Sequence, residues 1–552
     1  MKTDHADASW ITANGRSLYA WIHRPASLQS KGTVVLAPSL GREQVVSYRS
    51  LRVLAMMLAE QGWVAVRFAF SGTGESEDQP LEPADGAPSW IVENWLEDLS
   101  AVVDFAQRVG GHQTVHGIGL RMGAALLAEV DAPALGMRLL WEPVAGKMFL
   151  RQHSTLRRLG LPDGPDPLPE LMELGGLSLS QTQGAAVAQL PDPAKAGPKA
   201  GHVIVKEADP KVAKLIYAAV SLWATTPIAS LQRLIDQLPT GSVEALPPFT
   251  PKTITTLRVP GYGAPVTEEI VLVGPDAVPA VYTSPVGEIR GPAAQFAAAS
   301  AEPKDGATSL WVQAARRLGA RGIPAMRFER TGCGDLGHRN DVKDPNPYTP
   351  EAIRDSVNTA WWLLERTGRP ATGIGLCAGA WLMAVTSDRA PLDRVVMINN
   401  VAWREQLGFY EQVYANMVPT VGVGALRNME SVLSKPGLKS RIKDALRDHG
   451  PYGLWLALGR AGKVNAPEVM MEMGSRSAEL LLYFGSEDAE LFTQEHGQEG
   501  LRRLRRAGRT IEVHQDLALD HALLAQRSRL NALAIIDDAM EERSTSQALA
   551  SA

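Results

Sequence analysis

The residues best suited to covalent chemistry lie in one short segment, GLCAG at positions 375–379. An apolar run precedes it at 371–374 and another follows at 380–385, which predicts a buried strand, a tight turn and a helix. The flanking glycines leave room for a turn that keeps the side chain of Cys377 exposed. Because such a turn places Cys377 at a helix N-terminus, the helix dipole favours its thiolate, the nucleophilic form. The segment therefore predicts a reactive cysteine; the competing interpretation is a small, buried apolar residue.

The same pattern occurs earlier in the chain, with a different residue at its centre. The segment GIGLRMGA at 117–124 matches GIGLCAGA at 373–380, so Arg121 stands where the later copy has Cys377. Other segments match in the same order along the two halves: 64–68 with 324–328, 70–75 with 330–335, and RLLW at 138–141 with RVVM at 394–397. Ordered matches of this kind indicate an internal duplication.

Each half alternates β-rich runs with helical segments, as where the run 64–68 is followed by the amphipathic stretch 89–109. This alternation predicts a mostly parallel sheet with helices on both faces, and ligands bound outside the carboxyl ends of the strands. Irregular, helix-rich stretches at 144–201 and 401–476 interrupt the pattern, and we expect each to form a cap over a site. The predicted fold class is therefore α/β, in two tandem domains.

The domain boundaries follow from where this pattern stops. A final strand is expected at 242–246 in the first half and at 510–514 in the second. Two stretches rich in Pro or Gly, 247–252 and 261–265, are candidate linkers. The expected parts of the chain are a first domain at 1–252, a second domain at 267–543 and a frayed, disordered tail at 544–552. We expect the two domains to dock as an intramolecular pseudo-dimer.

The bulk properties argue against several classes of protein. The 552 residues carry a net charge of −5 with acids and bases interspersed, so nothing favours binding to nucleic acid or to an anionic membrane. Only two cysteines are present, which leaves no disulfide framework and favours a reducing, cytoplasmic location. The first residues lack the apolar core of a secretory signal, and no run of about 18 apolar residues predicts a membrane helix.

The sequence also gives no reason to expect a bound metal ion or organic cofactor. No Cys/His cluster has the spacing of metal ligands. The Gly-x-Gly pairs at 72–74 and 332–334 are too short for a dinucleotide fingerprint and follow the wrong strand. His338 is expected to be a solvated loop residue, and Cys333, in the second of these loops, a bystander rather than a redox partner of Cys377.

Both halves resemble the α/β-hydrolase superfamily, whose nucleophile lies at the centre of a G-x-S-x-G turn between a strand and a helix. They are similar in particular to its serine-aminopeptidase-like and dienelactone-hydrolase-like members. The first half is also similar to the hydrolases associated with exosortase systems, from Arg67 through the segment 72–76 to the turn that bears Arg121. The resemblance implies two tandem α/β-hydrolase-like domains, each with a cap insertion.

In that superfamily the catalytic residues follow the order nucleophile, acid, histidine. The second half contains all three in this order: Cys377, then Asp488 after a predicted strand, then His521 after the last strand. The resemblance thus implies that His521 is the general base and that Asp488 orients it, with Glu487 as the alternative acid. Taken singly, His521 also fits an exposed loop residue and Asp488 a helix N-cap.

The resemblance further implies an oxyanion hole, which would bind the negative oxygen that develops during acyl transfer. One donor would be the backbone N–H of Ala378, directly after the nucleophile. The second would come from the loop near Ala299 or Ser300.

The first half departs from this pattern. Arg121 cannot act as an acyl nucleophile, because a guanidinium stays protonated at neutral pH. No histidine follows the last predicted strand, and Asp209 is at most a relic of the acid. We therefore expect a pseudo-hydrolase in which Arg121 pairs with Glu142. The alternative is that Arg121 binds an acidic group of the substrate.

Together these features predict a hydrolase or acyltransferase that attacks an ester, lactone, thioester or activated amide and passes through an acyl-thioester on Cys377. Its substrate would be a small molecule, an acyl donor or a peptide. Two other functions stay open at this point. One is a non-catalytic binding or scaffold protein on two degenerate hydrolase folds, and the other is a peptide-modifying enzyme that uses Cys377 as a covalent foothold.

Overall fold

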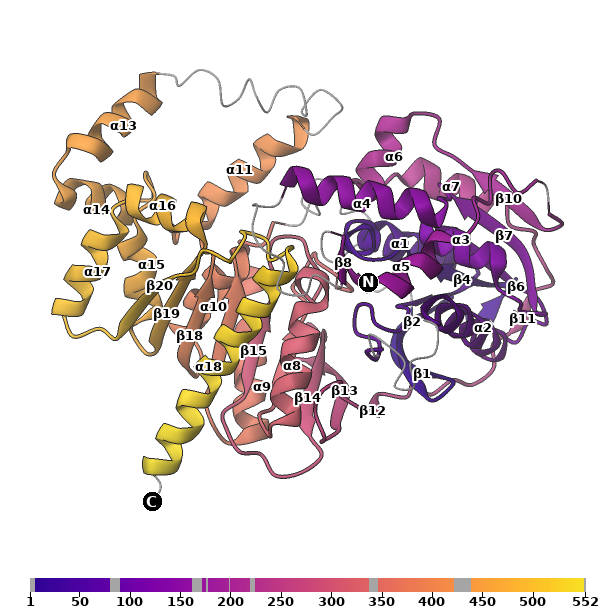
Figure 1. Ribbon diagram of the computed structural model, residues 1–552, viewed down its shortest axis with the longest axis horizontal. Coiled ribbons are helices and arrows are strands. Elements are labelled where there is room, and N and C mark those ends of the chain that lie inside the picture. The colour runs from indigo at the N-terminus through magenta and orange to yellow at the C-terminus, as the bar shows by residue number, and fades with distance from the viewer. Residues whose placement is uncertain are drawn as a thin grey trace. The chain divides into compact units, whose positions relative to one another are not determined.

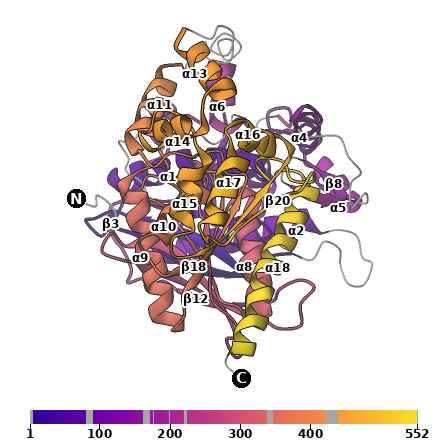
Figure 2. The same ribbon diagram turned by 90° about the vertical axis from the view of Figure 1, so that its left-hand side faces the viewer.

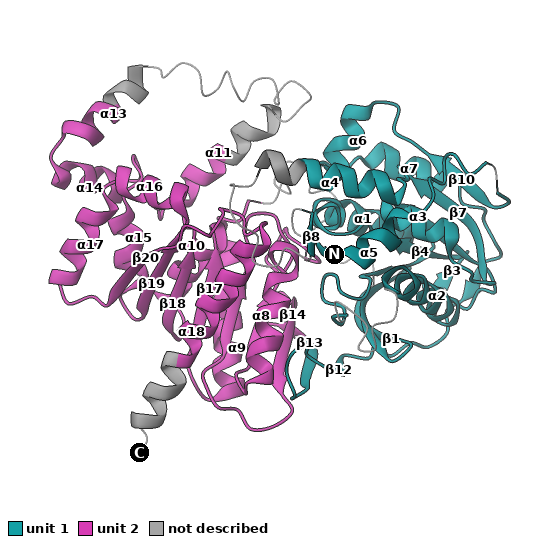
Figure 3. Ribbon diagram, viewed as in Figure 1, with its two compact units in different colours: residues 1–270 teal, residues 271–552 magenta. Residues whose placement is uncertain are grey.

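The computed structural model describes residues 5–79, 90–160, 171–174, 177–197, 199–218, 224–336, 346–420 and 438–550. His338 lies outside these residues. The chain divides into two compact units, residues 1–270 and 271–552 (Figure 3). The chain forms two large sheets, each with its own hydrophobic core, and the second sheet begins at residue 254, shortly before the division between the units.

The first unit contains a seven-stranded sheet with the strand order β1-β2-β5-β4-β6-β7-β10 (Figure 1). Its strands are β1 (His5–Ala13), β2 (Arg16–Arg24), β4 (Thr33–Ala37), β5 (Val64–Phe68), β6 (Val115–Leu120), β7 (Leu135–Trp141) and β10 (His202–Val205). The pairs β1–β2 and β2–β5 are antiparallel, and the pairs from β5 to β10 are parallel. The central strands are buried along their whole length, as expected for a sheet covered on both faces.

Helices supply that cover. One core joins the sheet to α2 (Ile91–Gly110) and α3 (Met122–Glu129). A second core joins it to α1 (Arg42–Glu60), α6 (Pro210–Tyr217) and α7 (Ile228–Asp236). Between β7 and β10 the chain carries an insertion, at the place where the sequence predicts the first cap. Its described elements are α4 (Gly146–Gly160), β8 (Leu171–Glu173), β9 (Ser178–Ser180) and α5 (Gln181–Ala188).

The second sheet has nine strands in the order β12-β13-β14-β16-β15-β17-β18-β19-β20. They are β12 (Ile254–Leu257), β13 (Val266–Val273), β14 (Val278–Pro285), β15 (Ala294–Ala297), β16 (Ala325–Phe328), β17 (Ala371–Leu376), β18 (Leu392–Ile398), β19 (Glu479–Phe484) and β20 (Ile511–Gln515). The pairs from β16 to β20 are parallel. The order from β13 to β19 repeats that of the first sheet strand for strand, and β12 and β20 add one strand at each edge.

Helices also cover both faces of the second sheet. On one face, α8 (Leu310–Ala320) and α18 (Gln526–Ala550) lie side by side (Figures 1 and 2), joined by ion pairs from Arg317 and Arg321 to Asp537. On the other lie α9 (Pro350–Thr367), α10 (Ala378–Ser387), α15 (Pro467–Gly474) and α17 (Gly497–Arg506). The second insertion also contains α11 (Leu407–Thr420), α13 (Leu438–His449) and α14 (Tyr452–Arg460). Among the described helices, none has both the length and the apolarity that a membrane span requires.

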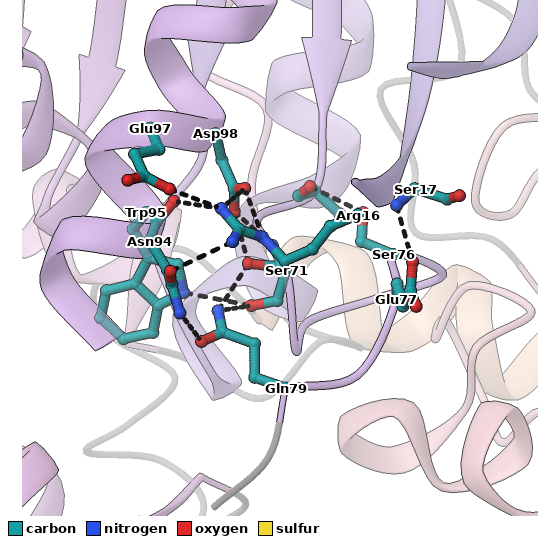
Figure 4. A network of polar contacts seen from close by, with 11 residues as sticks. Arg16, Ser17, Ser71, Ser76, Glu77, Gln79, Asn94, Trp95, Glu97 and Asp98 are labelled. Carbon is teal, nitrogen blue, oxygen red and sulfur yellow. Dashed lines mark hydrogen bonds and ion pairs between the residues drawn. The ribbon is translucent and has the colours of Figure 1, made fainter. Parts of the chain in front are cut away.

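A buried polar network fixes the loop that follows β5 (Figure 4). Ser71 donates to one oxygen of Asp98 through its backbone N–H at 2.9 Å and its hydroxyl at 2.5 Å. Arg16 donates to the other oxygen at 3.0 Å, and the indole N–H of Trp95 donates to the Ser71 carbonyl at 3.1 Å. Burial raises the pKa of Asp98, while Ser71 and Arg16 oppose that rise. The carboxylate thus ties this loop to α2 and β2.

The second unit repeats the central contact of this network. The backbone N–H of Thr331, in the loop after β16, donates to Asp355 on α9 at 2.7 Å. Burial again raises the pKa of the carboxyl group, and the bond from Thr331 opposes the rise. Loop and helix are therefore joined in the same way in both units, which supports the duplication predicted from the sequence.

Two ends of the predicted pattern differ from the structure. The last strand predicted for the first half, 242–246, is reduced to β11 (Glu244–Ala245). It pairs with β3 (Gln29–Ser30) outside the main sheet, because two exposed residues have no apolar face to bury against the sheet's edge. The predicted tail is helical as far as Ala550, where α18 ends.

The alignment of the repeat is also wrong by one residue in one strand. The sequence match equates Arg138 with Arg394. In the sheets, Arg138 lies opposite Gly117, whereas Gly373, the counterpart of Gly117, lies opposite Val395. Irregularities near the start of β6 and β17 shift the register of the neighbouring strands β7 and β18. Arg138 and Arg394, which the sequence match pairs, therefore point to opposite faces of their sheets.

Candidate active site in the second unit

Cys377 occupies a sharp turn between β17 and α10. Its backbone has φ 51° and ψ −114°, a conformation that costs a residue with a side chain about 1–3 kcal/mol. Its N–H donates to the carbonyl of Ile398 on the neighbouring strand at 2.9 Å. Because surrounding structure must hold such a strained residue, the turn is a rigid mount for the thiol.

The two flanking glycines explain how the chain turns so tightly. A Cβ atom on Gly375 would lie 2.3 Å from the backbone of Gly379. A Cβ atom on Gly379 would lie 2.3 Å from the carbonyl oxygen of Ala297 at the end of β15. Neither approach is possible for a larger residue, so the Gly-x-Cys-x-Gly spacing is a steric requirement of this turn.

The structure brings the other two predicted triad residues to this turn. Asp488 lies in the first turn of α16 (Ser486–Gln494), directly after β19, with its side chain 4% exposed. His521 lies in the loop between β20 and α18, and its Nδ1 donates to Asp488 Oδ1 at 2.8 Å. The hydrogen bond to Asp488 and then that to Cys377 raise the pKa of His521 to about 11, although burial opposes the shift. Since Nδ1 faces Asp488, Nε2 is left for Cys377.

The structure also separates the two candidate acids. Asp488 is buried and meets His521, whereas the neighbouring Glu487 is exposed to solvent. The geometry therefore favours Asp488 as the partner of the imidazole.

The predicted oxyanion donors lie on adjacent segments. Ala378 is the first residue of α10, so its N–H is at the helix N-terminus, where no intrahelical acceptor is available. Ala299 lies two residues beyond β15, in the segment whose carbonyls contact Gly379. The guanidinium of Arg330 fixes this segment by donating to the carbonyls of Ala299 and Ser300.

One buried polar residue at the site was not predicted. Asn399 directly follows β18 and is fully buried, with φ 50°. Its amide contacts the backbone of Gly485, three residues before Asp488, and that of Asp520 and His521. A polar residue directly after a buried strand, at the edge of the sheet where ligands bind, is the sequence signal that could have identified it.

The first unit has the same turn without the same chemistry. Arg121 lies between β6 and α3 with φ 56° and ψ −115°, and its N–H donates to the carbonyl of Trp141 at 3.0 Å. Its guanidinium is buried and donates to both oxygens of Glu43, with its closest contact at 3.0 Å. It also donates to Gln152 at 2.6 Å and lies 4.0 Å from the ring centre of Tyr217. The position of the nucleophile is thus filled by an internally satisfied ion pair.

The predicted partner of Arg121 is therefore wrong. Glu142 instead accepts a hydrogen bond from the backbone N–H of Glu207 at 2.6 Å. Glu43 was overlooked because it lies in the first turn of α1, far from Arg121 in sequence, on a helix whose start the pattern did not reveal. Asp209 is exposed and caps the N-terminus of α6 through Lys211, so it does not occupy the place of a buried acid.

The remaining candidates have no place in the site. The thiol of Cys333 is buried and donates to the carbonyl of Glu302 at 3.0 Å. Within the described part of the chain, no three His, Cys, Asp or Glu side chains form a group that could hold a metal ion.

No protein-family profile matches the sequence, and no curated protein matches it. Solved structures do align with it. Est1E from Butyrivibrio proteoclasticus, with ferulic acid bound, is 16% identical over 41% of this chain and 98% of its own, with a TM-score of 0.28. The esterase Est22 is 14% identical over 50% of this chain and 82% of its own, with a TM-score of 0.32. The hypothetical protein PA2218 from Pseudomonas aeruginosa is 16% identical over 43% of this chain and 94% of its own, with a TM-score of 0.29.

The fold follows from the features described above. Both units have a mostly parallel sheet covered by helices on both faces, with a strained strand–turn–helix elbow at the same place in the strand order. In the second unit Cys377, Asp488 and His521 follow one another along the chain, and the side chains of Asp488 and His521 are hydrogen-bonded. The chain therefore consists of two tandem units with the fold of the α/β-hydrolase superfamily.

Proposed function

We propose that the second unit is a cysteine-dependent acyl hydrolase or acyltransferase with Cys377 as nucleophile. The observation that carries this proposal is the row of Asp488, His521 and Cys377 at a strained elbow, in which Asp488 and His521 are hydrogen-bonded and Cys377 contributes to the raised pKa of His521. Each residue of the row fits a structural role when taken alone, but their convergence at one turn is the arrangement that activates a nucleophile. The retained row favours an enzyme over a scaffold.

The proposed resting state is an ion pair. Because the pKa of His521 is raised to about 11, its imidazole is protonated at neutral pH. An imidazolium beside Cys377, at the N-terminus of α10, stabilises a thiolate. Asp488 holds the ring by its Nδ1–H, so Nε2 presents a proton to the reacting atoms.

Acylation then follows from this geometry. The thiolate attacks the carbonyl carbon of the substrate, and the oxygen that becomes negative accepts hydrogen bonds from the N–H groups of Ala378 and Ala299. The bond to the leaving group breaks, and the imidazolium gives that group its proton. The product is an acyl-thioester on Cys377 and a neutral His521.

Deacylation restores the starting state. Neutral His521 removes a proton from water, or from another acceptor, as the acceptor attacks the thioester carbon. The sulfur leaves as thiolate beside the reformed imidazolium. Esters, lactones, thioesters and activated amides are the proposed substrates, because a thiolate displaces their leaving groups more readily than the amine of an unactivated amide.

In this proposal the first unit is catalytically idle. Its ion pair between Arg121 and Glu43 occupies the position of the nucleophile, and its last predicted strand, after which the histidine would lie, is absent from the main sheet. Its contribution would be to the stability of the chain.

The proposal is tested by covalent trapping. The full chain is incubated with a panel of acyl thioesters, nitrophenyl esters and lactones, and its intact mass is followed with time. An acyl adduct on the peptide containing Cys377, absent in Cys377→Ala and present in Cys333→Ala, is the expected result. Two results together would overturn the proposal. They are the absence of any adduct or turnover across the panel, and equal rates of alkylation of Cys333 and Cys377 by iodoacetamide.

A further inference from the structure

We propose that Asn399 is a positioning residue that holds the acid-bearing and the base-bearing segments of the site in register; this inference rests on the function proposed for Cys377, Asp488 and His521. Asn399 does not touch the reacting atoms. Its amide joins the two backbone segments whose side chains must meet, so it would act on the reaction through His521.

Both ends of the Asn399 side chain are used. Oδ1 accepts from the backbone N–H of Gly485 at 2.8 Å, and Gly485 is the N-cap of the helix that carries Asp488. Nδ2 donates to the carbonyl of Asp520 at 2.9 Å and to that of His521 at 3.3 Å. The side chain is fully buried, so these bonds are not in competition with water. One amide therefore ties the position of Asp488 to that of His521.

The loop that carries His521 needs such an external tie. Internally it is organised by Asp520, whose carboxylate accepts from the backbone N–H groups of Ala522, Leu524 and Ala525. These bonds fix the shape of the loop but not its distance from Asp488. On the side of α18, the hydroxyl of Ser528 accepts from the backbone N–H of Asp520. Asn399 binds the carbonyls of Asp520 and His521 and so supplies the tie between this loop and the segment of Asp488.

A comparison with the first unit shows which hydrogen bonds of Asn399 serve the fold and which serve the site. Glu142 is the counterpart of Asn399, since each directly follows its strand with a positive φ, 46° and 50°. The backbone N–H of each donates to the adjacent strand, to Val205 and to Tyr483 respectively. Glu142 also accepts from the backbone N–H of Glu207, as Asn399 does from Gly485.

The hydrogen bonds that Asn399 donates have no counterpart in Glu142. A carboxylate has no hydrogen to donate, whereas an amide has two. The acceptor contact thus occurs in both units, where it serves the fold, and the donor contact occurs in the unit that has a histidine loop to hold. This contrast assigns the Nδ2 group of Asn399 to the site rather than to the fold.

The test uses the rate at which iodoacetamide alkylates Cys377 in the full chain, measured from pH 5 to pH 9, because it needs no substrate. In the wild-type chain the ion pair with His521 should keep Cys377 reactive at pH 6. Asn399→Asp keeps the acceptor and removes the donor, and is expected to slow alkylation at pH 6 by about tenfold and to move the profile toward that of a free thiol. Glu142→Gln, the matched change in the first unit, should leave the profile unchanged.

The controls distinguish this inference from the proposed function. If His521→Ala leaves the profile unchanged, the proposed ion pair fails, whatever Asn399 does. If His521→Ala shifts the profile and Asn399→Asp does not, the ion pair stands and the positioning role is overturned. Should Asn399→Asp not fold, Asn399→Gly removes both contacts while accepting the positive φ without strain. A wild-type profile in that variant would overturn the role, and a shifted one with an unchanged melting temperature would support it.

Discussion

The two elbows of this chain have nearly the same backbone and opposite chemistry. Arg121 and Cys377 differ by only 5° in φ and 1° in ψ, and both N–H groups bond to the neighbouring strand. The strained turn is therefore a property of the fold and persists without a nucleophile. What distinguishes the units is the set of side chains that other elements bring to the turn. One unit delivers Asp488 and His521, and the other delivers Glu43 and Gln152.

The largest expected effect comes from removing the base. His521→Ala should lower the rate of acyl transfer by roughly 10²–10⁴, because the proton donor and acceptor of both steps is lost. The measurement is the rate of adduct formation and turnover with whichever acyl donor labels the wild-type chain. The matched control is His514→Ala, an exposed histidine on β20 that stacks on Tyr483 and lies outside the row.

A second pair of variants sharpens the assignment of the acid. Asp488→Asn should lower the same rate, since it removes the acceptor that orients the ring, whereas Glu487→Gln should leave it unchanged. The reverse outcome would mean that the acid is one position earlier than the geometry indicates.

The comparison predicts that the first unit can be damaged without touching the chemistry. Arg121→Met leaves the carboxylate of Glu43 buried without its cation, and breaking a buried pair in this way costs about 3 kcal/mol. Chemical denaturation should show this loss, while the acylation rate of Cys377 stays at its wild-type value. The double change Arg121→Met with Glu43→Gln should recover part of the stability, because no unpaired charge remains.

An increase in KM with an unchanged kcat in Arg121→Met would contradict this picture. It would mean that Arg121 contacts an acidic group of the substrate and contributes equal binding to ground and transition states.

The parts that could be predicted from sequence are those encoded by local pattern. Buried strands, helices and the Gly-x-x-x-Gly spacing are fixed by apolar periodicity and by close backbone approach, and they located Cys377 and Arg121 correctly. The order nucleophile, acid, histidine placed Asp488 and His521 at the strand ends where the structure has them. The strands, helices and glycine spacing require no knowledge of distant contacts, whereas the order of the three residues came from the resemblance to the α/β-hydrolases.

The missed features depend on such contacts. The linear pattern pointed to Glu142, which is near Arg121 in sequence, and only the packing of α1 against the elbow shows that Glu43 is the partner. Asn399 looked like an ordinary polar residue after a strand, since its role depends on two loops that meet only in the folded sheet. The register slip between β7 and β18 likewise arises from a local irregularity that similar letters conceal.

A buried charge cluster distinguishes the units in a further way. Lys304 contacts Glu329 at 3.3 Å and Asp335 at 3.0 Å, and all three side chains are almost fully buried. Burial raises the pKa of Glu329 to about 7, with Asp335 adding to the rise and Lys304 opposing it. The corresponding residue of the first unit is Ala69, because Phe68 and Phe328 hold equivalent places in their sheets.

Stability should therefore depend on pH through Glu329. The folded-state pKa lies above the unfolded value near 4.5, so the stabilising contribution is complete below pH 4.5 and is lost as the pH rises through 7. Glu329→Gln should remove this loss, and its unfolding free energy relative to wild type should rise by on the order of 3 kcal/mol between pH 4.5 and 8. Since His521 titrates in both proteins, the difference between them isolates Glu329. A constant difference across that range would show that the carboxyl group keeps one protonation state.

The smallest expected effect contrasts two thiols within one unit. Cys377 is partly exposed beside His521, whose pKa is raised, whereas Cys333 is buried and bonded to the carbonyl of Glu302. Thiolate content and access both favour Cys377, so limiting iodoacetamide at pH 7 should label it at least about tenfold faster, as measured by peptide mass spectrometry. In His521→Ala the thiol of Cys377 stays accessible but loses the neighbouring positive charge. The ratio of the two labelling rates should therefore fall toward the value set by solvent exposure alone. If the ratio is the same with and without His521, exposure explains the whole difference, and the contrast between the two units would be one of shape rather than of activated chemistry.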